Sequence, residues 1–196
     1  MSRIASRDPS SPRLTGRLSR SDLLWVANTG HGPAGHWHVR PRGSEREHDH
    51  LAAADDARRY LADHRVPVPD GPPDPAALDE LRITRAAVMR LLGTDDDPWA
   101  PNARALLAGA RYTVDERGAI ASAEPGWRGF CRDLLLPLVD LVTEGTRLGR
   151  CANPACRLVF EDGSRNRSRR WCDTTGCGNR DRVRRARTGR GLAIDG

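Results

Sequence analysis

The chain has 196 residues, enough for one medium domain and a small appended module. It has no run approaching the ~20 apolar residues that span a bilayer, and no apolar signal-peptide core. We therefore expect a cytoplasmic protein with no membrane contact. All 32 Lys+Arg residues are arginine. Residues 147–196 carry 13 of them against 5 acidic residues, whereas 1–146 carry 19 against 21. This asymmetry indicates an anionic partner at the C-terminal end.

The first 146 residues predict a mainly α-helical domain with small β elements. Residues 1–20, rich in Arg, Ser and Pro, are expected to form a disordered tail. A first helix is expected at Asp22–Thr29, with Ser21 or Asp22 as its cap. A long Gly/Pro-rich loop follows, in which WHV (37–39) could form a short strand. Its histidines are interpreted as exposed and not metal-bound: His31, His36, His38, His48 and His50.

Further helices are expected at Leu51–His64, Pro75–Leu92 and Pro101–Ala110. The second has Asp74 as a good N-cap, Pro75 at its first position and Gly93 at its end. RYTVD (111–115) and AIASA (119–123) predict a β-hairpin. A last helix is expected at Trp127–Glu144, kinked by Pro137. Cys131 lies on its apolar face and is interpreted as a small core hydrophobe.

Four of the five cysteines follow the spacing C-x4-C-x15-C-x4-C, namely Cys151, Cys156, Cys172 and Cys177. Two such pairs supply the four soft ligands of a tetrahedral Zn²⁺ ion. Four thiolates leave no position for a catalytic water, so we expect one structural zinc. Disulfides would need an oxidising compartment. A redox switch that releases zinc is possible in principle, but no feature of the sequence singles it out.

Between the pairs, residues 157–171 predict a strand, a DG turn and a second strand that ends at Trp171. A helix is expected at Gly178–Arg187. Hairpin, cysteine pair and helix in this order resemble a treble-clef finger. A module of about forty residues buries too little apolar surface to fold alone, and zinc would supply the missing stability.

The arginines of this module form two groups. Arg180, Arg184 and Arg187 share one helical face, with Arg182 and Arg185 beside it, while Arg165, Arg167, Arg169 and Arg170 lie on the expected second strand. Some of them offset the negative charge of a zinc–thiolate site. The rest repel one another until phosphates neutralise them and release counterions. All nine are candidate DNA contacts, and we predict that the helix lies in the major groove.

At Cys177-Gly178-Asn179-Arg180, SRNRSRRWC (164–172) and VFED (159–162), the sequence resembles the bacterial CGNR zinc-finger family. LLWVANT (23–29), DELRITRAAVMRLL (79–92) and the helix before the first cysteine are similar to the ABATE domain that usually precedes this finger. The resemblance implies a stress-related transcription regulator whose finger binds DNA. It does not assign the roles of Asn179 and Arg180. Asn179 could cap the helix or satisfy the hairpin backbone, and Arg180 could pair with Asp162 or Asp173. Gly178 could allow a tight turn at the metal.

These observations divide the chain into a tail at 1–20, an ABATE-like domain at 21–146, a finger at 147–190 and a tail at 191–196. The ABATE-like domain is expected to sense a signal or to form a homodimer. Two alternatives stay open, a zinc-stapled module that docks an acidic protein and an RNA-binding protein. Nucleotide-binding and nucleophile motifs are missing, and Asp95-Asp96-Asp97 fits a helix start better than a metal site. We therefore expect no enzyme and no small-molecule substrate.

Overall fold

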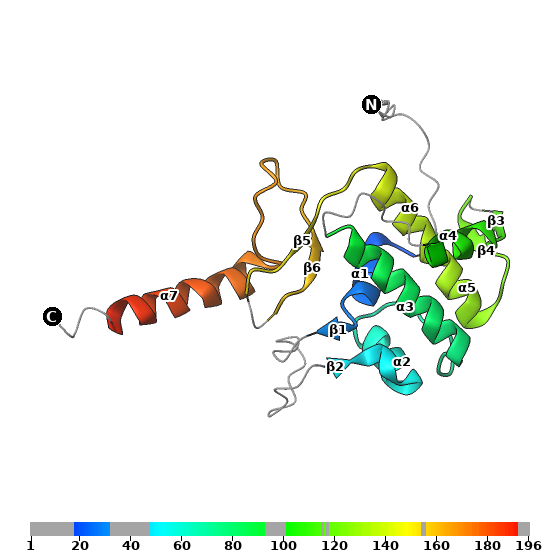
Figure 1. The fold of residues 1–196 in the computed structure, drawn as a ribbon, viewed down its shortest axis with the longest axis horizontal. Coiled ribbons are helices and arrows are strands. Elements are labelled where there is room, and N and C mark those ends of the chain that lie inside the picture. Colours follow the sequence, from blue (N-terminus) through cyan, green and yellow to red (C-terminus); the bar gives the residue numbers. More distant parts are fainter. Residues whose placement is uncertain are drawn as a thin grey trace.

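A computed structural model describes residues 18–31, 48–92, 101–114, 116, 118–153 and 156–191. Figure 1 shows a helical body, a small unit of strands and loops beside it, and one long helix, α7, that projects away from both. The expectation of a mainly helical fold with small β elements and a C-terminal finger is confirmed. None of the described helices is long and apolar enough to cross a membrane.

Four helices enclose the core of the body: α1 (Arg20–Ala27), α3 (Pro75–Arg90), α5 (Gly126–Asp133) and α6 (Leu135–Thr143). Leu23, Leu81 and Leu134 are fully buried between them. Helices α2 (Ala54–Asp63) and α4 (Pro101–Ala108) complete the body. Because this many large apolar side chains are buried, we expect the body to be stable without a metal.

Helix α3 starts as predicted. Asp74 accepts a hydrogen bond from the Ala77 amide at 2.8 Å, and Pro75 occupies the first helical turn. A cap of this kind satisfies an amide that has no partner within the helix. The helix ends at Arg90, two residues before the predicted Leu92. Gly93 lies outside the described residues, as do 37–39 and 95–97.

Helix α1 begins two residues earlier than predicted. Its N-cap is Ser19, and Ser19 and Asp22 form a reciprocal capping box in which each side chain accepts from the other's backbone amide. The expected caps Ser21 and Asp22 were therefore wrong, because Asp22 serves as the third residue of the box. Leu18 is buried, so the expected tail is ordered from residue 18 onward; residues 1–17 lie outside the described part.

The predicted helix 127–144 is two helices, with the break at Leu134. Pro137 has no amide hydrogen, so it cannot bond to the Asp133 carbonyl one turn earlier. The predicted effect of Pro137 is therefore confirmed, and it is larger than a kink, because the helix is interrupted at Leu134. In the same way, the predicted helix 51–64 begins as a separate 3-10 turn at His50–Ala52, and α2 starts only at Ala54.

Three antiparallel strand pairs complete the described fold. β1 (Gly30–His31) pairs with β2 (His48–Asp49), and β3 (Tyr112–Val114) pairs with β4 (Ile120–Ser122) as the predicted hairpin. β5 (Leu148–Arg150) pairs with β6 (Val159–Glu161) across the first two finger cysteines.

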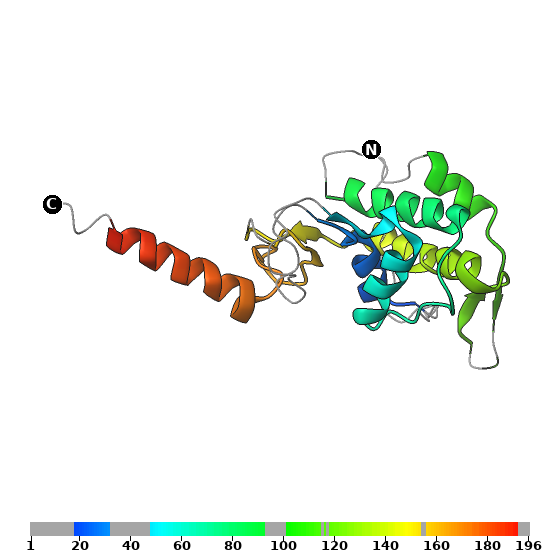
Figure 2. The same cartoon turned by 90° about the horizontal axis from the view of Figure 1, so that it is seen from below.

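The predicted second strand of the finger, which was to end at Trp171, was wrong. Residues 163–171 form turns and irregular chain, and β6 takes the earlier β5 as its partner. The chain reverses between Cys151 and Cys156, which brings β5 alongside β6. Four exposed arginines in the following segment repel one another and disfavour regular pairing there. Figure 2 shows α7 (Asn179–Gly191) leaving this unit, with the helical body on the other side.

Candidate metal centre and arginine-rich helix

The four finger cysteines form one cluster. The sulfur atoms of Cys151, Cys156, Cys172 and Cys177 all lie within 4.8 Å of one another. Cys172 Sγ is 3.6 Å from Cys156 Sγ and 3.7 Å from Cys177 Sγ. Three of the residues are buried and Cys172 is half-buried. The predicted pairs thus converge on a single point, as tetrahedral ligation requires.

A tight turn presents the first pair. The Cys151 amide donates to the Leu158 carbonyl at 2.8 Å, and the Cys156 amide donates to the Asn153 carbonyl at 2.9 Å. Arg157 follows in the left-handed region, with φ of 53°. These bonds close the chain between β5 and β6 and point both sulfurs to the same side.

The second pair belongs to the start of α7. Asp173 accepts hydrogen bonds from the Thr175 amide and hydroxyl at 2.9 and 2.8 Å, which begins a π-helical turn at Thr174–Gly178. The hydrogen bond from the Thr175 hydroxyl is the main cause of the lowered pKa of Asp173. Cys177 lies in this turn, so a metal bound there would fix the root of α7.

Gly178 packs against Trp171, a contact that the sequence did not indicate. A Cβ atom at this position would lie 3.2 Å from Cδ1 of Trp171, closer than most Cβ contacts. Glycine therefore lets the indole ring pack directly on the backbone where α7 begins. Trp171 is half-buried by this contact and has Arg170 above its ring at 5.4 Å.

The chemistry of the donor set fits zinc. Hydrogen bonds from Cys156 and Cys172 lower the pKa of the Cys151 thiol. Hydrogen bonds to Cys151 and Cys156 raise the pKa of Cys172, since a second thiolate so close to the first is repelled. A divalent cation removes that repulsion. Four converging sulfurs therefore match one structural Zn²⁺, with no position left for water.

Cys131 stays outside this cluster, as predicted. It is buried in the body, its sulfur lies 3.6 Å from the Ala77 carbonyl, and burial raises the pKa of its thiol. His50 was expected to be exposed, but it is half-buried, and its Nδ1 lies 2.9 Å from a carboxylate oxygen of Asp56. His36 and His38 lie outside the described residues.

Arg169 is an internal brace of the finger. Its guanidinium donates to the carbonyls of Trp171 and Glu161 at 2.9 and 3.3 Å and also to that of Cys172. It also lies over the Phe160 ring at 4.8 Å. This arrangement ties the irregular segment to β6, so the side chain that was expected to contact DNA is engaged within the finger.

The exposed arginines lie on two parts of the finger. Of the nine predicted DNA contacts, three besides Arg169 are exposed on the segment after β6, namely Arg165, Arg167 and Arg170. This segment starts where Asp162 accepts from the Ser164 hydroxyl at 2.5 Å. That bond is the main cause of the lowered pKa of Asp162. The others are exposed on α7: Arg180, Arg182, Arg184, Arg185 and Arg187.

Asp181 forms ion pairs with two of the arginines of α7. Its carboxylate pairs with Arg184 at 2.5 Å and with Arg185 at 2.7 Å, and the hydrogen bond from Arg184 chiefly lowers its pKa. In the described part of the chain no ion pair is seen for Arg182 or Arg187. These two guanidinium groups are therefore the more available of the set.

Asn28 joins the finger to the body, and sequence reasoning missed it. Its Nδ2 donates to the Val159 carbonyl at 3.1 Å, and its Oδ1 accepts from the Val159 amide at 2.8 Å. The side chain thus imitates a strand beside β6. Tyr60 donates to the Asn28 carbonyl at 2.9 Å from the other side. The signal available in the sequence was an asparagine directly after the apolar run LLWVA (23–27).

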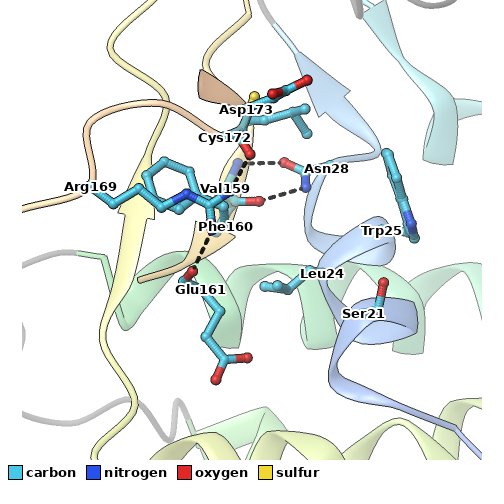
Figure 3. Close-up of a pocket in the computed structure, with 11 residues that line it drawn as sticks. Ser21, Leu24, Trp25, Asn28, Val159, Phe160, Glu161, Arg169, Cys172 and Asp173 are labelled. Carbon is cyan, nitrogen blue, oxygen red and sulfur yellow. Dashed lines mark hydrogen bonds between the residues drawn. The ribbon is translucent and has the colours of Figure 1, made fainter. Parts of the chain in front are cut away.

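A pocket of about 420 Å³ lies at this junction (Figure 3). Helix α1 contributes Leu24 and Trp25 to its lining, and the finger contributes Phe160, Arg169 and Cys172. Arg20 closes the same junction through ion pairs with Glu144 at 2.5 Å and Glu161 at 3.3 Å.

These features define a helical body carrying a four-cysteine zinc finger that ends in an arginine-rich helix. The chain belongs to the ABATE family, described as "putative stress-induced transcription regulator", whose model matches residues 23–162. The CGNR zinc finger model matches residues 147–190. Neither is a family of enzymes. No protein of curated function matches the sequence closely enough to count as a relative.

Proposed function

We propose that the protein is a DNA-binding transcription regulator whose finger contacts DNA through α7. The single observation that carries this proposal is the form of that helix. It projects from the body with five exposed arginines among residues 179–187, and only one acidic residue lies within that stretch. At about 1.5 Å per residue, a helix of this kind is of suitable width and length for the major groove.

In this proposal Cys151, Cys156, Cys172 and Cys177 bind one Zn²⁺ that orients α7 and takes no part in any reaction. Arg182 and Arg187 make the main phosphate contacts. Arg180, Arg184 and Arg185 support them, and Arg165, Arg167 and Arg170 reach the neighbouring backbone. Arg169 braces the finger. A reducing compartment, the cytoplasm, keeps the four thiols available for zinc.

The proposed division of labour follows the expected boundaries, with the body at 21–146 as the sensing or dimerising part and the finger at 147–190. The strand pair β5–β6 links them. Leu148 and Val159 pack in the core of the body although they lie within the finger's sequence. A signal received by the body therefore has a direct structural route to α7.

The decisive test compares two double variants in duplex DNA binding, followed by fluorescence anisotropy across a salt series. We expect Arg182→Ala/Arg187→Ala to weaken binding and to reduce the slope of log K against log salt by about 2. Arg111→Ala/Arg128→Ala removes the same charge from exposed positions on the body and should leave binding nearly unchanged. Equal binding by the wild type and the α7 variant would rule out α7 as the contact surface.

Two further ligands separate the alternatives. Single-stranded RNA should bind more weakly than duplex DNA, because Trp171 packs on Gly178 and is poorly placed to stack on bases. A polyglutamate peptide should compete only weakly, since point charges without groove geometry make fewer contacts. Stronger binding of either ligand would replace the DNA proposal by the RNA-binding or acidic-partner alternative.

A further inference from the structure

The four cysteines of the metal centre are unequally accessible. Cys151, Cys156 and Cys177 are only 3%, 5% and 0% exposed, whereas Cys172 is half-buried. Cys172 is also the only one of the four that lines the junction pocket of about 420 Å³. Figure 3 shows it beside Asp173 at the finger end of that pocket, with α1 on the other side. A small solute that enters the junction thus comes next to Cys172, the one of the four that borders the pocket.

The surroundings of Cys172 favour its reaction with an oxidant. Arg169 donates to its carbonyl, so a fixed positive charge lies beside a residue that must be a thiolate when it binds zinc. Two further sulfurs lie within reach, Cys156 Sγ at 3.6 Å and Cys177 Sγ at 3.7 Å. A sulfur oxidised at Cys172 therefore has a second thiolate in position to attack it.

We propose that Cys172 is the site at which a hydroperoxide oxidises the zinc centre. The Cys172 thiolate attacks one peroxide oxygen, the O–O bond breaks, and a sulfenic acid and hydroxide (or alkoxide) form. The thiolate of Cys156 or Cys177 then attacks the Cys172 sulfur, forms the disulfide and expels a second hydroxide. The two sulfurs together give two electrons to the peroxide, and solvent protons neutralise the hydroxides. With two ligands lost, Zn²⁺ is released.

Loss of zinc would free the root of α7, because Cys177 lies in the turn from which that helix begins. Oxidation should therefore lower DNA affinity. This consequence rests on the proposed function, whereas the order in which the thiols react does not.

The test uses the full zinc-loaded chain with hydrogen peroxide, a chromogenic zinc chelator to follow release, and alkylation with peptide mass mapping to follow each cysteine. We expect Cys172 to be the first thiol lost, every early disulfide to contain Cys172, and about one zinc per chain to be released with it. A first disulfide that lacks Cys172, or equal loss of all four thiols, would overturn the proposal. So would a centre that keeps its thiols and zinc under peroxide.

A pocket variant tests the access route. Ser21 is exposed and lines the pocket, so Ser21→Trp should narrow it and slow the modification of Cys172 severalfold. Ser168→Trp makes the same change at an exposed position outside the pocket lining and should react at the wild-type rate. Equal rates in both variants would show that the pocket is not the route. If the zinc protein never binds DNA but Cys172 still reacts first, the proposed function fails and the site stands.

Discussion

The helical body and the finger are held together by different means. Four helices of the body bury a continuous core of leucine, valine and alanine side chains, including Leu23, Leu81 and Leu134. The buried cluster of the finger consists of Phe160 and three of the four clustered cysteines. A region with one buried aromatic ring cannot stabilise itself by the hydrophobic effect alone, so its fold depends on the metal.

The two regions also differ in charge. The acidic and basic residues of 1–146 nearly balance, whereas arginine dominates 147–196. A core that contained many arginines would bury unpaired charges, and the desolvation free energy of those charges would exceed the stabilisation gained from packing. In the finger the arginines stay exposed to solvent, and the zinc–cysteine centre would stabilise the fold that carries them. The difference shows how a small unit can carry a dense charge without a large core.

The largest expected effect comes from removing the metal or a ligand. Chelation, or Cys177→Ser, should unfold α7 and the π-helical turn while the body keeps its fold. Apparent binding energies of structural zinc reach roughly 10 kcal/mol. Circular dichroism and hydrogen exchange should report loss of protection confined to the finger. Cys131→Ser is the matched control, since it should leave one zinc per chain. Global unfolding after chelation would show that the body also depends on the metal.

A smaller effect is expected where the two regions meet. Asn28→Ala removes both hydrogen bonds to Val159 and leaves its buried amide and carbonyl unpaired. Each unsatisfied group costs ~1–3 kcal/mol, so with two such groups the free energy of unfolding should fall by about 2–6 kcal/mol in urea titrations. Asn102→Ala changes an exposed asparagine on α4 and should cost much less. Zinc content should be unchanged. Equal stability of the two variants would show that the two hydrogen bonds between Asn28 and Val159 do not stabilise the protein.

Much of the body could be predicted from local sequence. Asp74 and Pro75 mark the start of α3 because a cap and a fixed φ act within one turn. The start of α1 was harder, since Ser19, Ser21 and Asp22 are all plausible caps and only the reciprocal bonds select Ser19. The cluster of four cysteines could be predicted from their spacing alone, because four ligands of one metal ion must converge on one point.

What escaped prediction depends on contacts between distant parts of the chain. β6 pairs with β5 instead of the arginine-rich segment, and Asn28 reaches Val159 across 131 residues. Nor could the nine arginines be ranked from their spacing. Arg169 turns inward to three carbonyls, and Asp181 takes Arg184 and Arg185, although all of these side chains look equally basic in the sequence.

The smallest expected effect concerns Asp181, the one acidic residue among the arginines of α7. Its carboxylate is ionised at neutral pH and pairs with Arg184 and Arg185, and the hydrogen bond from Arg184 chiefly lowers its pKa. Asp181→Asn should remove the ion pairs that Arg184 and Arg185 make with Asp181 and tighten duplex DNA binding on the order of threefold at moderate salt. Helix content should fall slightly, since an acidic residue in the first turn stabilises a helix.

Asp63→Asn removes the same charge from an exposed position on α2, which separates a local effect on α7 from a change in net charge. If both variants tighten binding equally, long-range attraction alone explains the gain. If only Asp181→Asn tightens binding, the ion pairs with Asp181 reduce the contribution of Arg184 and Arg185 to DNA binding in the wild type. A drop in affinity for Asp181→Asn would instead mean that the ion pairs position Arg184 and Arg185 for DNA, and that the two salt bridges belong to the binding surface.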